Sequence, residues 1–529
     1  IDIARGVGVA IENLSIAGIV SGGGTTAMID IVDSLDVQLE HLTIAAGATA
    51  DPTSAAIGFS GLILSATVRD CVLVAEQAIV SISSENKYLL TANLRMVHNV
   101  LMCSQIGISL TGTSLHYGQL RIADNLALIC AQAGIAVTGA ALPAASVTID
   151  GNILHVTGNG VIAGTDGLRI DNNEIVALAG KTVAHGIALV PGFDKGALDR
   201  VYVTGNRLRG QRGHGIAVRQ RLGRAIFKSN SIENTVGGAL VMDVGASADY
   251  LSIEGNQFAN LGVGFNSEAL PFFGVLLIAV KRADVVGNLF ANVARQAVVS
   301  PLRVAIMAMA SGELRVAGNR LLGIGPLASF NRRTIGIGVT PGFTDVAVDD
   351  NTVARVETDA DKVSVANWQA ILIVGSLQDE VGQNQTSMAA PGIVMLPLKS
   401  GNAYLSAGKI DLLNAARGSV MVRGNRLHGH TSLIPTAEIL VVQCCLFDQN
   451  DIRVTDGSSD GMLAGRILGD HASVANNRFA GSVDKVIFEL FVAKTKYSVL
   501  GNLRTAPILV NGTPDNALPP PWNALNVAI

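Results

Sequence analysis

The chain has 529 residues, more than one ordinary hydrophobic core organises, which predicts several domains or a repeat. Only 15% of the residues are charged and 49% are apolar, a composition typical of a membrane protein or of a fold that buries most of its strands. The longest apolar runs, 271–280 and 439–447, are about half the length of a transmembrane helix, and the net charge of −4 argues against a basic nucleic-acid binder. We therefore expect no membrane span and no nucleic-acid partner.

The N-terminal segment already has the pattern of a strand over residues 7–16, and the sequence begins at Ile1 without a methionine or a signal-peptide pattern. This predicts a missing N-terminal region in a longer polypeptide. The five cysteines are scattered and have no zinc-like spacing, so we expect small buried hydrophobes rather than disulfides. Because Cys444 and Cys445 are adjacent, both cannot point inward on one strand, and one is expected at the surface.

An internal repeat is the strongest signal in the chain. Asparagine recurs in one local context at intervals of 21 to 33 residues, with one interval of 74. The mean of the other intervals is near 27 residues. The recurring residues are Asn99, Asn125, Asn152, Asn173, Asn206, Asn230, Asn256, Asn288, Asn319, Asn351, Asn425, Asn450, Asn477 and Asn502.

The residues around each asparagine predict a strand that ends in a corner. The residue three before it is apolar in every case, and the residue five before is usually apolar too, as in Leu251 and Ile253 before Asn256. Seven of the asparagines follow a glycine. Asn tolerates the left-handed backbone of a sharp corner, and its amide can bond to the same amide on the next layer. We expect an asparagine ladder along one corner.

A second strand of the form Gly-Ile-x-Val recurs about half a repeat later, as at 134–137 and 215–218. Two or three short strands in the same order in every repeat predict an all-β fold, a single-stranded parallel β-helix in which each strand pairs with its equivalents above and below. The repeat length predicts about 19–20 coils at ~4.8 Å each, a rod of ~90 Å. We expect the β-helix to occupy residues 1–510.

This pattern resembles the right-handed parallel β-helix repeat of the pectate-lyase-like superfamily. The resemblance implies the fold and leaves the function open, because that superfamily includes polysaccharide lyases, hydrolases and epimerases as well as phage tailspikes, adhesins and other structural proteins. The C-terminal tail, residues 511–529, is also similar to the ending of β-helix proteins of phage-tail-like contractile injection systems. Its Leu518, Trp522 and three prolines suit a Pro-rich cap over the last coil.

One long interval departs from the repeat. The interval between Asn351 and Asn425 is read as one complete coil without its asparagine plus a protruding loop at about 376–391, either a binding loop or an ordinary insertion.

His428 and His430 share one face of an extended strand, but no third ligand is near, so we expect no metal site.

The outward position of the Gly-Ile-x-Val strands is not ionisable, so that face offers neither proton transfer nor cation binding. A small, apolar outward stripe is typical of a covered surface, and an upstream domain, an insertion or a neighbouring chain could cover it. We expect identical chains to pack there, as in trimeric β-helices; the alternative is a set of scattered alanines on a tolerant surface. The stripe consists of Ser109, Ala136, Ala188, Ala217, Leu240, Leu276, Gly338, Leu372 and Val394.

The strand before each asparagine has polar outward positions. Arg95 and Arg121 are expected to stack on successive layers, with Asp150 and Asp171 stacked further along beside Arg169. Stacked carboxylates can hold Ca²⁺ or act as acid and base across a glycosidic bond, while an Arg neutralises a uronate. The alternative is a solvated face of alternating charge with cross-strand pairs.

One coil is strongly cationic. Between Arg200 and Lys228 there are eight cations and no acid, an excess that could grip a polyanion such as an acidic glycan; an exposed-corner preference for Arg explains part of it. The candidate ligand-binding residues are Arg207, Arg209, Arg212, Arg219, Arg221, Arg224 and Lys228.

Two functions follow from these observations. The first, which we favour, is a structural and recognition module of an extracellular or phage-tail-like assembly that binds a surface glycan or a partner protein and needs no cofactor. The second is a polysaccharide lyase, glycoside hydrolase or epimerase that acts on an acidic polysaccharide through Asp150, Arg169 and Asp171, with Ca²⁺ as its cofactor under the lyase reading.

Overall fold

The structure of the chain is a computed structural model. It describes residues 1–20, 26–48, 54–82, 89–112, 115–180, 183–192, 196–326, 332–355, 368–375, 418–429, 434–454, 462–481, 486–492, 497–518 and 527–528. The chain consists of two compact units, Ile1–Thr235 (unit 1) and Val236–Ile529 (unit 2). Over the described residues no helix has the length and apolarity needed to cross a membrane.

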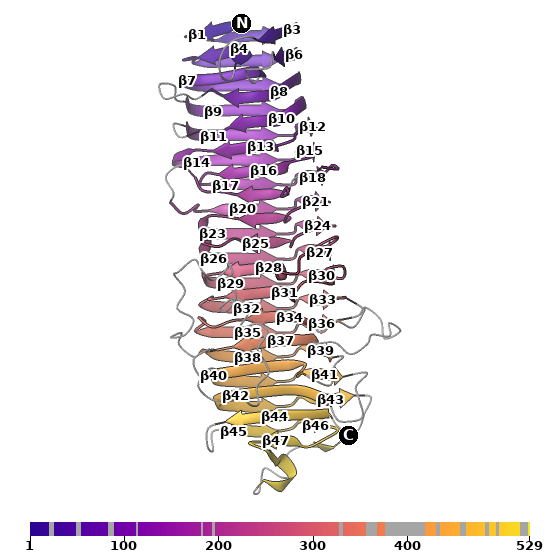
Figure 1. Cartoon of the computed structure of the whole chain (residues 1–529). Helices are drawn as coiled ribbons and strands as arrows, with labels where there is room; N and C mark the ends of the chain where they lie inside the picture. Colours follow the sequence, from indigo (N-terminus) through magenta and orange to yellow (C-terminus); the bar gives the residue numbers. More distant parts are fainter. Residues whose placement is uncertain are drawn as a thin grey trace. The chain divides into compact units, whose positions relative to one another are not determined.

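Each unit is a parallel β-solenoid in which successive repeats stack strand upon strand (Figure 1). Every coil contributes to three columns of strands, which we name A, B and C in chain order. The longest strands turn a corner and belong to two columns. The predicted all-β, parallel, repetitive fold is confirmed.

The columns of unit 1 are as follows. Column A consists of β1 (Asp2–Ala4), β4 (Thr26–Val32), the first part of β7 (Ser54–Arg69), the second parts of β8 (Val72–Ser81) and β10 (Val100–Leu110), β13 (Ala133–Thr138), β16 (Asn159–Gly164), β19 (Ile187–Leu189) and β22 (Ile216–Val218). Column B consists of β2 (Val9–Glu12), β5 (Asp36–Glu40), the second part of β7, β9 (Leu89–Val97), β11 (Leu115–Ala123), β14 (Ala140–Asp150), β17 (Leu168–Asp171), β20 (Val201–Thr204) and β23 (Arg221–Lys228). Column C consists of β3 (Ser15–Val20), β6 (Thr43–Ala48), the first parts of β8 and β10, β12 (Leu126–Leu128), β15 (Ile153–Val156), β18 (Glu174–Ala177), β21 (Arg207–Arg209) and β24 (Ser231–Glu233).

Unit 2 repeats the arrangement. Column A consists of β25 (Leu240–Met242), β28 (Phe272–Ile278), β31 (Leu302–Met309), β34 (Arg333–Val339), β37 (Trp368–Val374), the first parts of β40 (Ala437–Asp448) and β42 (Met462–Ala475), β44 (Val486–Val492) and β47 (Ile508–Val510). Column B consists of β26 (Ser247–Glu254), β29 (Val280–Val286), β32 (Glu313–Ala317), β35 (Asp345–Asp349), β38 (Ser419–Arg423), the second parts of β40 and β42, and β45 (Tyr497–Leu500). Column C consists of β27 (Gln257–Leu261), β30 (Leu289–Val293), β33 (Arg320–Leu322), β36 (Thr352–Ala354), β39 (Arg426–Gly429), β41 (Asp451–Val454), β43 (Arg478–Gly481), β46 (Leu503–Arg504) and β49 (Val527–Ala528).

The asparagine ladder lies between columns B and C and is completely buried. In unit 1 the backbone N–H and the side-chain Nδ2 of Asn99 both donate to Oδ1 of Asn125, at 3.0 and 2.9 Å. Asn125, Asn152, Asn173 and Asn206 repeat this pair of bonds toward the next asparagine, ending at Asn230. Each amide therefore joins neighbouring coils and also satisfies backbone groups at the corner.

Unit 2 contains the same ladder, from Asn256 through Asn288, Asn319 and Asn351 to Asn425 and on to Asn502. Asn351 donates directly to Oδ1 of Asn425, at 3.0 Å from both its nitrogens. The expected extra coil between these two residues is therefore wrong, because no layer fits between hydrogen-bonded asparagines. The described strands accordingly make fewer coils than the expected 19–20. The expected loop at 376–391 and Val394 lie outside the described residues.

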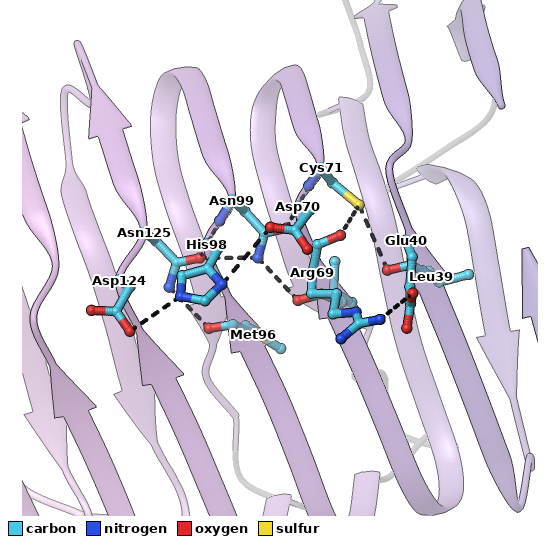
Figure 2. A network of polar contacts seen from close by, with 11 residues as sticks. Leu39, Glu40, Arg69, Asp70, Cys71, Met96, His98, Asn99, Asp124 and Asn125 are labelled. Atoms are coloured by element: carbon cyan, nitrogen blue, oxygen red, sulfur yellow. Dashed lines mark hydrogen bonds and ion pairs between the residues drawn. The ribbon is translucent and has the colours of Figure 1, made fainter. Parts of the chain in front are cut away.

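The left-handed backbone occurs one residue before each ladder asparagine, whereas we expected it at the asparagine itself. His98, Asp124 and Gly151 have φ of 58°, 56° and 63°, and none of the described ladder asparagines has positive φ. This explains why glycine so often precedes the asparagine, since glycine adopts positive φ without strain. Figure 2 shows the exposed side chains of this corner, where His98 lies 3.8 Å from Asp70 and 3.5 Å from Asp124. Such solvent-exposed pairs contribute little stability.

The outward stripe of the Gly-Ile-x-Val strands, which belongs to column A, is buried within the chain. Ser109, Ala136 and Ala188 are 7%, 3% and 2% exposed, and Leu276 is 0% exposed. Every residue of β28, β31, β34 and β37 is buried, so both faces of these strands are covered without a second chain. The stripe is therefore not an open surface for packing identical chains. The alternation of inward and outward residues along these strands identified the side chains that point away from the core, but it did not predict that they are buried.

The last described coil ends in a hairpin. β47 pairs antiparallel with β48 (Thr513–Pro514), and a short 3₁₀ helix, η1 (Asp515–Ala517), follows. Asp515 is 1% exposed, accepts from Arg504 Nε at 2.9 Å and accepts from the backbone N–H of Ile508 at 3.3 Å. These bonds attach the segment to the last coil. Leu518 is buried, and Trp522 lies outside the described residues.

Candidate functional site

The candidate acidic site on column B of unit 1 forms as the sequence predicts. Arg95 and Arg121 are register partners on neighbouring strands, and Asp150 and Asp171 are register partners on β14 and β17. Arg169 Nε donates to Asp171 Oδ2 at 3.1 Å, and its guanidinium lies 5.9 Å from the centre of the Tyr202 ring. The three candidate catalytic residues are therefore close together.

The hydrogen bonds of Asp171 limit what this site can do. Both carboxylate oxygens accept hydrogen bonds, one from Arg169 and one from the hydroxyl of Thr204, and the residue is 7% exposed. Asp150 accepts from Asn172 Nδ2 at 3.2 Å. A general acid or base must reach the substrate with a free oxygen or proton. The geometry matches a self-contained charged cluster better than a catalytic pair of carboxylates.

The seven candidate ligand-binding cations divide among three columns of one coil. Arg207 and Arg209 lie on β21 in column C, with Arg212 just after it; Arg219 follows β22 in column A. Arg221, Arg224 and Lys228 lie on β23 in column B. All seven are exposed, and Arg209 forms an ion pair with Glu233 at 3.5 Å. Because the columns face different directions, the cations form a belt around the coil rather than one patch.

A pair of stacked histidines lies beside the cationic belt. The rings of His185 and His214 are 5.3 Å apart and inclined by 18°, and the backbone N–H of His214 donates to His185 Nδ1 at 3.0 Å. Arg219 Nη2 lies 3.0 Å from His185 Nε2. Burial, with smaller contributions from electrostatic interaction with His185 and Arg219, lowers the pKa of His214 to about 3. His214 is therefore neutral in the folded protein at physiological pH.

This lowered pKa predicts a loss of stability on mild acidification. The unfolded chain binds a proton at His214 below about pH 6.5, whereas the folded chain binds it only near pH 3. The stability of the folded protein that depends on neutral His214 is therefore fully present above pH 6.5 and is lost as the pH falls. When the pH is lowered from 6.5 to 5, we expect the free energy of unfolding of the parent to fall by ~1–2 kcal/mol more than that of the His214→Gln variant. Urea unfolding at the two pH values measures this difference. The exposed His41→Gln variant is the control. Equal pH dependence in all three proteins would contradict this assignment.

A shallow depression of about 150 Å³ lies on column B of unit 2. Its charged lining comes from register partners on three neighbouring strands. Arg282, Glu313 and Asp345 form one row, and Asp284 and Arg315 form the row beside it. Arg282 Nε lies 4.0 Å from Glu313 Oε2, and both side chains are more than 60% exposed.

Tyr250 borders this depression on β26. Its hydroxyl donates to Asp284 Oδ2 at 3.0 Å, and the Arg282 guanidinium lies 6.0 Å from the centre of its ring. Register partners on adjacent strands are ~4.8 Å apart, so hydrogen-bond acceptors and donors lie close together over this surface. Such exposed ion pairs contribute little stability, which leaves their oxygens and nitrogens ready to exchange partners with a ligand.

Sequence reasoning did not single out the residues of this depression. The signal was present, since Tyr250, Arg282, Glu313 and Asp345 each lie six residues before a ladder asparagine. It also missed that the outward stripe becomes charged in later coils. Glu438, Arg466 and Glu489 continue the register of Leu372, and Arg466 lies 3.5 Å from Glu438 and 2.7 Å from Glu489.

The remaining candidates give no site. His430 lies outside the described residues, and the described part of the chain contains no group of three or more His, Cys, Asp or Glu residues arranged to hold a metal ion. All five cysteines are free; Cys71, Cys103, Cys130 and Cys445 are buried and Cys444 is exposed, as expected.

No protein-family model matches the chain, and no curated protein matches its sequence.

Proposed function

We propose that the chain is a structural and recognition module that binds a hydroxyl-rich surface glycan, and that the depression on column B of unit 2 is its binding surface. The observation that supports this most directly is the close grouping of acceptors and donors there, with Glu313 and Asp345 in the same row as Arg282 and with Arg315 beside Asp284. Carboxylates accept hydrogen bonds from sugar hydroxyls, and guanidinium groups donate to them. The Tyr250 ring adds an apolar face on which a sugar ring can pack.

The shape of the depression favours an extended ligand. It is small and open, whereas sites that enclose a small molecule are usually deep and apolar. A rigid strand array holds these side chains at fixed spacing, so a chain of sugars lying along it meets polar groups at each of these coils.

The cellular setting is part of the same proposal. The repeat that resembles the pectate-lyase-like superfamily, and the tail that is similar to those of phage-tail-like injection systems, support an extracellular or particle-associated assembly. The alternative function, an enzyme acting on an acidic polysaccharide, is favoured only by the closeness of Asp150, Arg169 and Asp171. We do not adopt it, because Arg169 and Thr204 already occupy both oxygens of Asp171.

Binding to a glycan array by the full chain tests the proposal. We expect the Arg282→Ala/Arg315→Ala variant to bind the recognised glycan at least ~10-fold more weakly, because two charged hydrogen-bond donors are lost. Arg320→Ala is the matched control, since Arg320 is also exposed in unit 2 but lies on β33 in column C. Absence of glycan binding by the parent, or equal loss in the control, would contradict the proposal.

A further inference from the structure

An apolar surface on column C of unit 1 is exposed in the described part of the chain. Among its outward side chains, Val72, Val74, Met102 and Ile153 are 38%, 38%, 42% and 42% exposed. These residues lie on β8, β10 and β15, and β12 lies between β10 and β15 in the same column (Figure 1). Large apolar side chains at this exposure in neighbouring positions mark an interaction surface.

The register of these strands makes the surface continuous. One row runs through Val72, Val100, Leu126 and Ile153, and a second row runs through Val74, Met102 and Leu128. We name these seven residues the apolar stripe. Because register partners are ~4.8 Å apart, their side chains contact one another along each row. The inward residues between the rows, such as Leu73 and Leu101, are fully buried, so the stripe is additional to the core.

Column C becomes polar at both ends of the stripe. Beyond Ile153 the same row continues with Glu174 on β18 and Arg207 on β21, and both are exposed. In the other direction it continues with Thr43 on β6 and Ser15 on β3. The exposed residues His41 and Glu12 lie shortly before these two strands.

The two ends of column C also differ in charge. Arg207 and Arg209 lie on β21 near one end, whereas the exposed Glu12 lies shortly before β3 at the other. Two copies side by side in the same direction would bring like charges together. Two copies in opposite directions bring the acidic end of one to the cationic end of the other.

The size of the surface agrees with a second copy lying along the whole column. Eight strands of column C, from β3 to β21, span about 34 Å, and four residues per strand span about 13 Å, which gives about 440 Å² of flat area. The four strands of the stripe alone cover less than half of this. Stable interfaces bury about 800 Å² per partner, so even pairing along the full column gives a small interface, and weak association with a micromolar dissociation constant is expected.

We propose that unit 1 forms an antiparallel, two-fold symmetric dimer with a second copy of this chain through the apolar stripe. The two-fold axis passes between β10 and β12, the middle of the stripe. This symmetry places β18 of one copy opposite β6 of the other, and β21 opposite β3. Glu174 then lies near His41 of the second copy, and Arg207 lies near its Glu12.

Sedimentation velocity of the full chain between 1 and 100 μM tests the association. We expect a concentration-dependent dimer, and we expect Met102→Lys/Ile153→Lys to weaken it at least ~100-fold, because four lysines would enter an apolar interface. Leu64→Lys is the control, since Leu64 is 50% exposed but lies on β7 outside column C. A parent that stays monomeric, or lysines on the stripe with no more effect than the control, would overturn the proposal.

Cross-linking of introduced cysteines in a Cys444→Ser background tests the orientation, since Cys444 is the exposed cysteine. Because facing sheets are ~10 Å apart, we expect a bismaleimide of about that length to join two copies of Ser15→Cys/Arg207→Cys, and not two copies of Arg207→Cys alone. A dimer trapped by Arg207→Cys alone would show parallel packing and overturn the antiparallel arrangement. The glycan surface lies in unit 2, so loss of dimerisation is expected to leave its sugar contacts intact, and the two proposals fail separately.

Discussion

Replacing Asn319 by alanine is expected to lower the free energy of unfolding by about 3–5 kcal/mol. The change removes the oxygen that accepts from the backbone N–H and Nδ2 of Asn288, both at 2.9 Å. It also removes the donor to the Val285 carbonyl at 2.8 Å and to Asn351 at 2.9 Å. All these groups are buried, so water cannot replace the lost partners. Urea unfolding followed by circular dichroism measures the change.

Asn266→Ala is the matched control, because Asn266 is an exposed asparagine of the same unit outside the ladder. We expect its effect to stay within ~0.5 kcal/mol. A loss below ~1 kcal/mol for Asn319→Ala would mean that the ladder contributes little to the stability of unit 2.

The second large effect is expected at Glu438, in the charged continuation of the outward stripe. Glu438 is 2% exposed and accepts from Arg333 Nη2 at 3.1 Å and from Gln369 Nε2 at 2.9 Å. Arg333 and Gln369 are also buried, and Arg333 Nε donates to Gln369 Oε1 at 2.8 Å. Glu438→Ala leaves a buried guanidinium without its carboxylate, which typically costs ~3–5 kcal/mol. The measurement is again urea unfolding.

Glu489→Ala provides the comparison for this prediction. Glu489 pairs with Arg466 at 2.7 Å, but its side chain is 20% exposed and Arg466 is 21% exposed. Water can hydrate Arg466 after this change, so we expect a loss of only ~1 kcal/mol or less. Similar losses for the two variants would contradict the assignment of Glu438 as the buried centre of the network.

The fold was predictable because its determinants are local and periodic. A strand pattern before each asparagine, repeated at a near-constant interval, is enough to predict parallel stacking, and Asn206 and Asn230 are hydrogen-bonded as expected. The position of the left-handed residue was not predicted correctly. Both members of a Gly-Asn pair tolerate positive φ, so the sequence alone does not tell which of them turns the corner.

Tertiary burial and coil count were harder to predict. The outward residue Ala217 is 0% exposed, and the alternation of residues along its strand did not predict that burial. The 74-residue interval was read as containing an extra coil because its length allows one. Only the direct bond from Asn351 to Asn425 excludes it.

In the candidate sites, the sequence predicted which residues are register partners but not how their side chains are hydrogen-bonded. Repeat spacing correctly predicted that Asp150 and Asp171 stack, since register follows from the repeat. It did not predict that Thr204 on the next strand saturates Asp171, because hydrogen bonding depends on side-chain rotamers. The apolar stripe of column C was missed because the search for outward residues covered only columns A and B.

Disulfide formation between register partners is the most direct test of the central claim, that residues one repeat apart are in-register neighbours. In a Cys444→Ser background, Arg282→Cys/Glu313→Cys is expected to form an intramolecular disulfide, because register partners have Cα atoms ~4.8 Å apart. Arg282→Cys/Arg315→Cys is expected to remain reduced, since a shift of two residues places the Cα atoms ~8 Å apart. Mass spectrometry of the oxidised proteins would contradict the account if the second pair forms the disulfide and the first does not.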